Sequence, residues 1–116
     1  MSAVTIVGAG LMGAGIAQVA ASAGYDVILV DTAEASLTKA VDQIGGSLAK
    51  FAAKGRLTEG ERDAALDRIT TTTDLHAADS SDLIVEAVFE NVEVKKEIFV
   101  ALDAIAKPDA VLATNT

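Results

Sequence analysis

The sequence predicts an α/β domain in which helices cover both faces of a parallel sheet. Two observations carry this prediction. Short apolar runs recur along the chain without polar alternation, as in strands that are buried on both faces. Segments with helical spacing of apolar residues separate these runs, and strands that alternate with helices form doubly wound parallel sheets.

A glycine-rich turn follows the first apolar run, residues 4–7. Gly8, Gly10 and Gly13 have the spacing G-x-G-x-x-G, typical of a turn that receives a dinucleotide. The first glycine permits the tight turn, the second lets backbone amides approach a pyrophosphate, and the third lets a helix pack against the strand. Apolar residues then recur at helical spacing: Met12, Ile16, Val19 and Ala23.

Asp31 closes the second apolar run, residues 27–30, and follows Gly13 by 18 residues. A carboxylate at the carboxyl end of this strand can accept hydrogen bonds from both hydroxyls of an adenosine ribose. Its charge would repel a 2'-phosphate, and no Lys or Arg follows it before Lys39. The pattern therefore predicts NAD rather than NADP.

The stretch from residue 33 to residue 69 contains no strand signal. Apolar residues follow one another there in steps of four and three: Leu37, Val41, Ile44, Leu48 and Phe51. Thr58 and Glu61 then have the spacing of a capping box, so we expect a helical hairpin that turns at residues 54–57. Basic residues gather at this turn, either as a solvated surface or as an anion contact: Lys50, Lys54 and Arg56.

Three further runs complete the expected sheet. Residues 69–72 are rich in β-branched side chains, residues 83–88 are apolar except for Glu86, and residues 110–113 are apolar. Helical spacing recurs between the last two runs, at Val94, Ile98, Ala101, Leu102 and Ile105. We expect one Rossmann-type domain over residues 1–116 with strand order 3-2-1-4-5, without the sixth strand of a complete dinucleotide-binding fold.

Composition excludes several classes of function. Seventeen acidic and nine basic residues give a net charge of −8, which disfavours nucleic acid and anionic membranes as partners. The absence of cysteine excludes disulfides and thiolate metal sites and favours a cytoplasmic protein, and no metal site is expected. Residues 1–25 carry no charge, but the lack of a basic start and five glycines argue against a signal peptide or membrane helix.

Ligands of parallel α/β sheets bind at the carboxyl ends of the strands. The loops there place Glu90, Asn91, Lys95 and Asn115 near the expected cofactor, although Glu90 and Lys95 could equally form an exposed ion pair. His76 is the only histidine and thus the one imidazole available as a general base. It lies in a polar connection without a motif, so we interpret it as a surface residue.

Three separated motifs resemble one family. Residues 8–17, residues 82–88 with Glu90 and Lys95, and residues 113–116 are similar to the amino-terminal part of the 3-hydroxyacyl-CoA dehydrogenases, the bacterial 3-hydroxybutyryl-CoA dehydrogenases above all. The resemblance covers the whole chain. It implies an NAD-dependent oxidoreductase of fatty acid metabolism that interconverts 3-hydroxyacyl-CoA and 3-ketoacyl-CoA by hydride transfer.

The resemblance also implies roles for individual residues. It assigns the cofactor pyrophosphate to the turn formed by Gly8, Ala9, Gly10, Leu11, Met12 and Gly13. Asp31 would hold the adenosine ribose, and Glu90 and Lys95 the nicotinamide end. Ser47 and Lys54 would hold the CoA portion of the substrate.

The chain departs from the family after Thr116. The family's substrate-binding serines, its His-Glu pair for proton transfer and its helical carboxyl-terminal domain have no counterpart here. We therefore expect NAD binding without turnover, assign no catalytic residue, and expect the parent protein to be a homodimer through the missing domain. Two alternatives remain: a related NAD(P)-dependent dehydrogenase of hydroxy acids or sugar acids, and a non-catalytic NAD-binding module.

Overall fold

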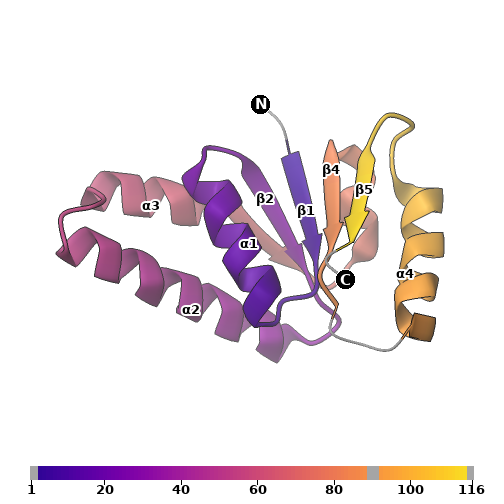
Figure 1. The fold of residues 1–116 in the computed structure, drawn as a ribbon, viewed down its shortest axis with the longest axis horizontal. Helices are drawn as coiled ribbons and strands as arrows, with labels where there is room; N and C mark the ends of the chain where they lie inside the picture. The colour runs from indigo at the N-terminus through magenta and orange to yellow at the C-terminus, as the bar shows by residue number, and fades with distance from the viewer. Residues whose placement is uncertain (1–2, 89–91, 115–116) are drawn as a thin grey trace.

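The computed structural model describes residues 3–88 and 92–114, which form three layers (Figure 1). The middle layer is a parallel sheet of five strands: β1 (Ala3–Val7), β2 (Asp26–Val30), β3 (Ile69–Thr72), β4 (Leu83–Glu86) and β5 (Val111–Thr114). The strand order β3-β2-β1-β4-β5 confirms the predicted topology. Because the four strand pairs are parallel, the carboxyl ends of the strands share one edge.

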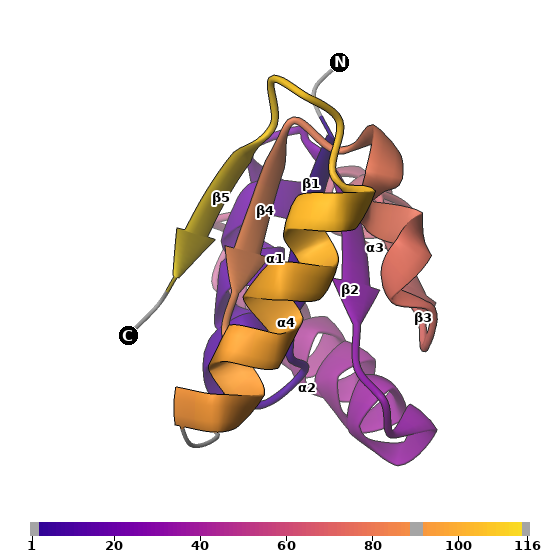
Figure 2. The same ribbon diagram turned by 90° about the vertical axis from the view of Figure 1, so that its right-hand side faces the viewer.

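Helices cover the two faces of this sheet unequally. One face carries α1 (Leu11–Ser22), α2 (Glu34–Ala53) and α3 (Glu59–Asp67), and the other carries the 3-10 helix η1 (Leu75–Ser80) and α4 (Val92–Ile105) (Figures 1 and 2). The chain winds outward in opposite directions from β1 and from β4, and right-handed crossovers then place the helices on opposite faces. The switch between these directions opens a crevice beside β1 and β4.

The core has two parts, one on each face of the sheet. Val4 and Ile6 of β1 pack towards α1 and α2, whereas Val7 packs with Ile84 and Leu102 on the face of α4. Successive side chains of a strand point to opposite faces, so both sides of β1 are buried, as its apolar run predicts. Complete burial of an aliphatic side chain such as Ile6 contributes about 1.5–3 kcal/mol.

α1 forms where the spacing predicts it but buries a different face. Its buried residues are the small ones, Gly13, Ala14, Ala17 and Ala21. Met12 and Val19, which belong to the predicted apolar stripe, are 54% and 70% exposed. The reason is close packing, because a Cβ atom on Gly13 would overlap the carbonyl oxygen of Gly8.

The helical hairpin is present in the predicted place. α2 and α3 pack together, and the buried residues of α2 include Leu37, Ile44 and Leu48. At the start of α3 the amide of Glu61 donates to Thr58 Oγ1 and the amide of Thr58 donates to Glu61 Oε1, each at 3.0 Å. The capping box read from the sequence is therefore confirmed.

The predicted bounds of two strands, β4 and β5, are wrong by one or two residues. β4 stops at Glu86 rather than at Val88, and β5 covers residues 111–114 rather than 110–113. The amide of Ala87 still donates to Val7 O at 2.8 Å, but the amide of Val88 turns to the Glu86 carboxylate at 2.6 Å. This side chain therefore ends the strand by capturing the next backbone donor.

Two kinds of feature are missing from the described residues. None of the helices in this part of the chain combines the length and the apolar character that a membrane crossing requires. Within residues 3–88 and 92–114, moreover, no three His, Cys, Asp or Glu side chains are grouped so that they could hold a metal ion.

Candidate functional site

A cleft of about 630 Å³ opens at the carboxyl edge of the sheet, beside β1 and β4. Its walls come from the glycine turn, the end of β2, the turn after β4 and the first half of α4. The lining residues are Val7, Gly8, Gly10, Val30, Asp31, Thr32, Ala33, Ser36, Thr73, Leu75, Ala87, Val88, Val94 and Ile98. This position is where parallel α/β sheets bind their ligands.

The glycine turn forms one wall of this cleft. Gly8 has a φ of 111°, and its amide donates to Val30 O at 2.7 Å, which ties the turn to β2. A Cβ atom there would lie 2.8 Å from Ala87 O, whereas one on Gly10 would meet nothing within 4 Å. The backbone at Gly10 is therefore open to a ligand.

α1 begins directly after this opening. Its N-cap, Gly10, offers no side-chain cap, so the amide groups of the first turn keep their capacity to donate. These donors and the positive end of the helix dipole suit a phosphate group. The turn therefore fits a pyrophosphate, although Leu11 and Met12 point largely to solvent, being 76% and 54% exposed.

Asp31 follows the last residue of β2, lines the same cleft beside the glycine turn, and is half-buried. Its Oδ2 accepts a hydrogen bond from the amide of Ala9 and its Oδ1 accepts one from the amide of Ala33, both at 2.9 Å. Among the described residues that line the cleft, none is Lys or Arg. The carboxylate is thus held in the wall of the cleft, and the described lining residues provide no cation to receive a 2'-phosphate.

Glu86 is the site residue that sequence reasoning missed, because we interpreted it as an interruption of a strand. It is completely buried at the carboxyl end of β4. Its carboxylate accepts from the amide of Val88 (2.6 Å), from Thr114 Oγ1 (2.8 Å) and from Lys95 Nζ (3.1 and 3.3 Å). A single acid inside an apolar strand was the available signal, since acids are almost never fully buried without partners.

The other residues expected around the cofactor are only partly described. Lys95, in the first turns of α4, forms an ion pair with Glu86, and its side chain is 19% exposed. Glu90, Asn91 and Asn115 lie outside the described residues, as does Thr116. The expected neighbourhood of Glu90 and Lys95 thus stays a prediction.

The two residues expected to contact CoA lie on α2, away from the cleft. Ser47 is half-buried, and its Oγ accepts a 2.9 Å hydrogen bond from Gln18 Nε2 of α1. Lys54 is exposed at the C-cap of α2, together with the exposed Lys50 and Arg56. Ser47 and Lys54 are seven residues apart, so they share one face of the helix, about 10 Å from each other along its axis.

His76 lies at the surface, in agreement with its interpretation. Its side chain is 79% exposed on η1, and its Nδ1 is 3.2 Å from Asp74 Oδ1. The backbone amide of His76, followed by its ring, holds the pKa of Asp74 below the ordinary value of 3.8. His76 is not among the cleft-lining residues.

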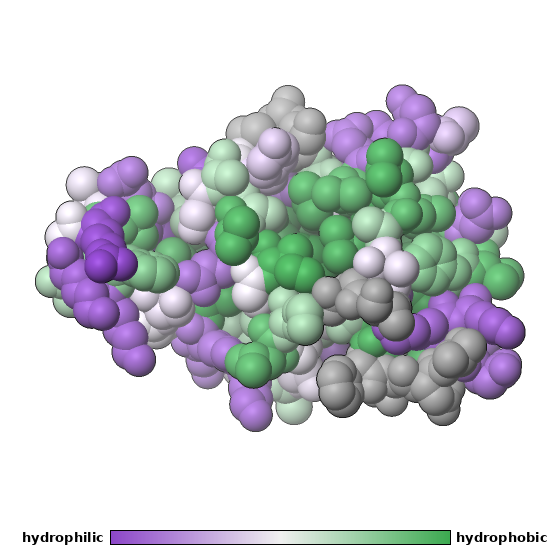
Figure 3. Space-filling model, viewed as in Figure 1, coloured by the Kyte–Doolittle hydropathy of each residue, from purple (hydrophilic) through white to green (hydrophobic). Residues whose placement is uncertain are grey.

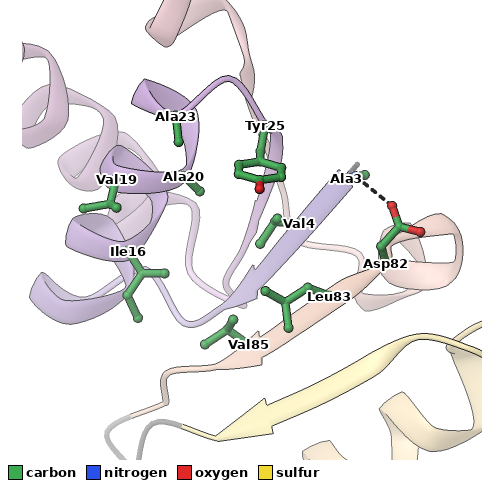
Figure 4. A pocket seen from close by; sticks show the side chains of 10 residues that line it. All are labelled: Ala3, Val4, Ile16, Val19, Ala20, Ala23, Tyr25, Asp82, Leu83 and Val85. Carbon is green, nitrogen blue, oxygen red and sulfur yellow. Dashed lines mark hydrogen bonds between the residues drawn. The ribbon is translucent and has the colours of Figure 1, made fainter. Parts of the chain in front are cut away.

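A second, apolar groove of about 390 Å³ runs between α1 and β4 on the opposite face from α4 (Figure 4). Ile16 and Val19 of α1 face Leu83 and Val85 of β4 across it, with Tyr25 at one end. Apolar side chains also gather over this face in Figure 3. Asp82 is the one acid among the described residues that line this groove, and it accepts from the amide of Ala3, so the groove offers packing surface rather than chemistry.

Comparison with known proteins agrees with this geometry. The family described as "3-hydroxyacyl-CoA dehydrogenase, NAD binding domain" matches residues 3–116. A 3-hydroxybutyryl-CoA dehydrogenase of Mycobacterium tuberculosis is 48% identical over 114 residues, which are 97% of this chain and 40% of that protein. The mitochondrial hydroxyacyl-coenzyme A dehydrogenase of Homo sapiens is 45% identical over 119 residues, 97% of this chain and 38% of that protein.

A solved structure extends the likeness to three dimensions. The crystal structure of a 3-hydroxybutyryl-CoA dehydrogenase from Escherichia coli superposes with a TM-score of 0.96 at 42% sequence identity. The superposition covers 99% of this chain and 24% of that one. This chain therefore spans about 40% or less of the length of these similar proteins.

Proposed function

Because this chain belongs to the 3-hydroxyacyl-CoA dehydrogenase family and corresponds to its NAD-binding domain, we propose that it provides the cofactor half of such an enzyme. The whole protein would interconvert 3-hydroxyacyl-CoA, 3-hydroxybutyryl-CoA in particular, and 3-ketoacyl-CoA in fatty acid metabolism. The chain of 116 residues by itself would bind NAD without turnover. One observation carries the proposal: Gly8, the α1 N-cap Gly10 and Asp31 line a single cleft.

Each part of this cleft has a task towards NAD, which supplies the acceptor for a hydride. The amides at the start of α1 would hold the pyrophosphate, and Gly10 would let it approach the backbone. Asp31 would accept hydrogen bonds from the adenosine ribose, while Lys95, with Glu90, would contact the nicotinamide end. Support for Lys95 comes from its position beside the carboxyl ends of β4 and β5.

The CoA ester would contact the helical hairpin through Ser47 and Lys54. Support comes from charge, since Lys50, Lys54 and Arg56 form an exposed basic cluster on a protein with a net charge of −8. CoA carries several phosphates, so its contacts are favoured where the local charge is positive. The hydrogen bond from Gln18 would orient the Ser47 hydroxyl for such a contact.

Calorimetric titration of the chain with NADH and with NADPH tests the cofactor assignment. We expect NADH to bind at least tenfold more tightly, because Asp31 meets a ribose hydroxyl in one case and a phosphate in the other. Equal affinities would contradict the role of Asp31, and absence of binding to both would contradict the proposal. An assay with acetoacetyl-CoA and NADH should show no turnover by this chain.

The CoA assignment is tested by reversing one charge. Lys54→Glu should weaken binding of acetoacetyl-CoA several-fold and leave NADH affinity unchanged. Lys39→Glu, which changes another exposed lysine of α2, serves as the control and should leave both affinities unchanged. A non-catalytic NAD-binding module, the competing interpretation, predicts that neither variant affects CoA-ester binding, because there is none.

We also propose that the whole protein is a cytoplasmic homodimer. A chain without cysteine suits a reducing compartment. Sedimentation of the whole protein and fractionation of its host cell test these two points, and a monomer or an exported protein would contradict them.

A further inference from the structure

One buried acid in the described structure touches three different elements at the carboxyl edge of the sheet. The Glu86 carboxylate, fully buried, accepts from Lys95 Nζ on α4, from Thr114 Oγ1 on β5, and from the amide of Val88 in the turn after β4. Neither of the roles proposed above for the glycine turn and for Asp31 requires this arrangement.

The sheet register explains why these groups meet. Val7, Glu86 and Thr114 are register partners on β1, β4 and β5, so their side chains point to the same face. That face is the one covered by α4, where Val7 packs with Ile84 and Leu102. Glu86 is therefore the next inward residue of β4 after the core residue Ile84, and it directly precedes Ala87 and Val88, which line the cleft.

Stability does not account for an acid at this position. A buried carboxylate loses its hydration, and its partners do little more than offset that loss, so apolar residues often replace buried ion pairs without cost. The neighbouring inward position of the same strand, Ile84, is apolar and completely buried. Unlike an apolar side chain, the carboxylate orients its hydrogen-bond partners: the Lys95 ammonium, the Thr114 hydroxyl and the Val88 amide.

We propose that Glu86 is a positioning residue for the nicotinamide end of the cofactor. Its carboxylate fixes the positions of the Lys95 ammonium and of the backbone at residues 87–88. The charge and the shape of this end of the cleft are therefore already in place when the nicotinamide and its ribose bind. The adenosine end depends on Asp31 and the glycine turn instead. This inference rests on the proposed binding of NAD.

The test compares two ligands on the same variants. NADH carries both halves of the cofactor, whereas ADP lacks the nicotinamide and its ribose. For Glu86→Gln we expect NADH affinity to fall about tenfold and ADP affinity to stay unchanged. We also expect the fluorescence of bound NADH to move towards that of the free cofactor, since the nicotinamide is less firmly held.

A matched control exists at the other end of the same strand. Asp82, directly before β4, accepts from the amide of Ala3 and pairs with Lys107, and it is remote from the cleft. Asp82→Asn makes the same charge change as Glu86→Gln and should leave both ligands unaffected. On α4, Lys95→Met should reproduce the loss of NADH affinity, whereas Lys96→Met, at the exposed neighbouring position, should not.

The double variant Glu86→Gln/Lys95→Met should lose no more NADH affinity than Lys95→Met alone. Unchanged NADH affinity in a folded Glu86→Gln protein would overturn the inference, and so would equal losses for NADH and ADP, which indicate a general structural role. If Glu86→Gln does not fold, Thr114→Val provides the test, because it removes one hydrogen bond to the Glu86 carboxylate. We expect this variant to bind NADH two- to threefold more weakly and ADP with unchanged affinity. Failure of the unaltered chain to bind either ligand would instead refute the proposed function.

Discussion

The amide of Ala9 donates a 2.9 Å hydrogen bond to Oδ2 of Asp31, and this contact joins the glycine turn after β1 to the end of β2. The other carboxylate oxygen accepts from the amide of Ala33 just before α2. Asp31 therefore connects the glycine turn, the end of β2 and the start of α2 around the cleft. Its proposed contact with the adenosine ribose would be made by a carboxylate that is already held in position.

Replacement of Asp31 should affect both cofactor binding and the loops. Hydrogen bonds to a charged group contribute about 1.5–3 kcal/mol each, so Asp31→Ala should weaken NADH binding tenfold or more and lower the melting temperature. Asp31→Asn keeps one acceptor oxygen, so its NADH affinity and melting temperature should lie between those of the unaltered chain and those of Asp31→Ala. Asp26→Ala, at the exposed start of the same strand, is the control for both measurements. Unaltered NADH affinity in Asp31→Ala would disprove the ribose contact.

The two glycines inside α1 should respond in opposite ways to the same substitution. Gly13→Ala places a methyl group on the carbonyl oxygen of Gly8 and should reduce the free energy of unfolding by about 1–3 kcal/mol. Gly15 is exposed, with nothing within 4 Å of an added Cβ, so Gly15→Ala should raise it by about 0.5–1 kcal/mol. Chemical denaturation measures both, and equal effects would contradict the close helix-strand contact.

The capping box at the start of α3 should contribute measurably to stability. Thr58→Ala removes the acceptor for the Glu61 amide, so we expect a loss of about 1 kcal/mol in the free energy of unfolding. Thr58→Ser keeps the hydroxyl and should behave like the unaltered chain. Thr38→Ala, at an exposed position within α2, is a control for the loss of a threonine side chain. A Thr58→Ala protein as stable as the original would mean that this helix start frays.

The pair of Asp82 and Lys107 should make stability depend on pH at both extremes. Its hydrogen bond lowers the pKa of Asp82 from 3.8 and raises the pKa of Lys107 from 10.5. The carboxylate's contribution is present above pH 3.8 and is lost as the pH falls through the lowered value. The ammonium's contribution is present below pH 10.5 and is lost as the pH rises through the raised value.

Urea denaturation of the unaltered chain and of Asp82→Asn across this range gives the difference directly. We expect the difference in unfolding free energy to be constant near neutral pH, and to shrink below pH 3.8 and above pH 10.5. A difference that does not vary with pH would show that the pair contributes nothing.

Local sequence pattern predicted most of the fold. The glycine turn, the two halves of the capping box and the five strands depend on residues that are close together in the chain, so their spacing is readable. The buried face of α1 was not predictable from this spacing. Large apolar residues at helical spacing normally point inward, but here α1 packs so closely on the strand that only small residues fit between them. The end of β4 was missed for a related reason, since the Glu86 side chain captures the Val88 amide.

The sequence by itself determined the topology of this protein, its cofactor class and its family, since these follow from motifs such as Gly8 to Gly13 and from the order of strands and helices. The tertiary structure alone decided which side chains act together. Glu86, Lys95 and Thr114 are up to 28 residues apart and meet because register and crossover bring β4, β5 and α4 to one edge. Contacts between elements depend on packing in space, which the linear pattern of one strand or helix does not contain.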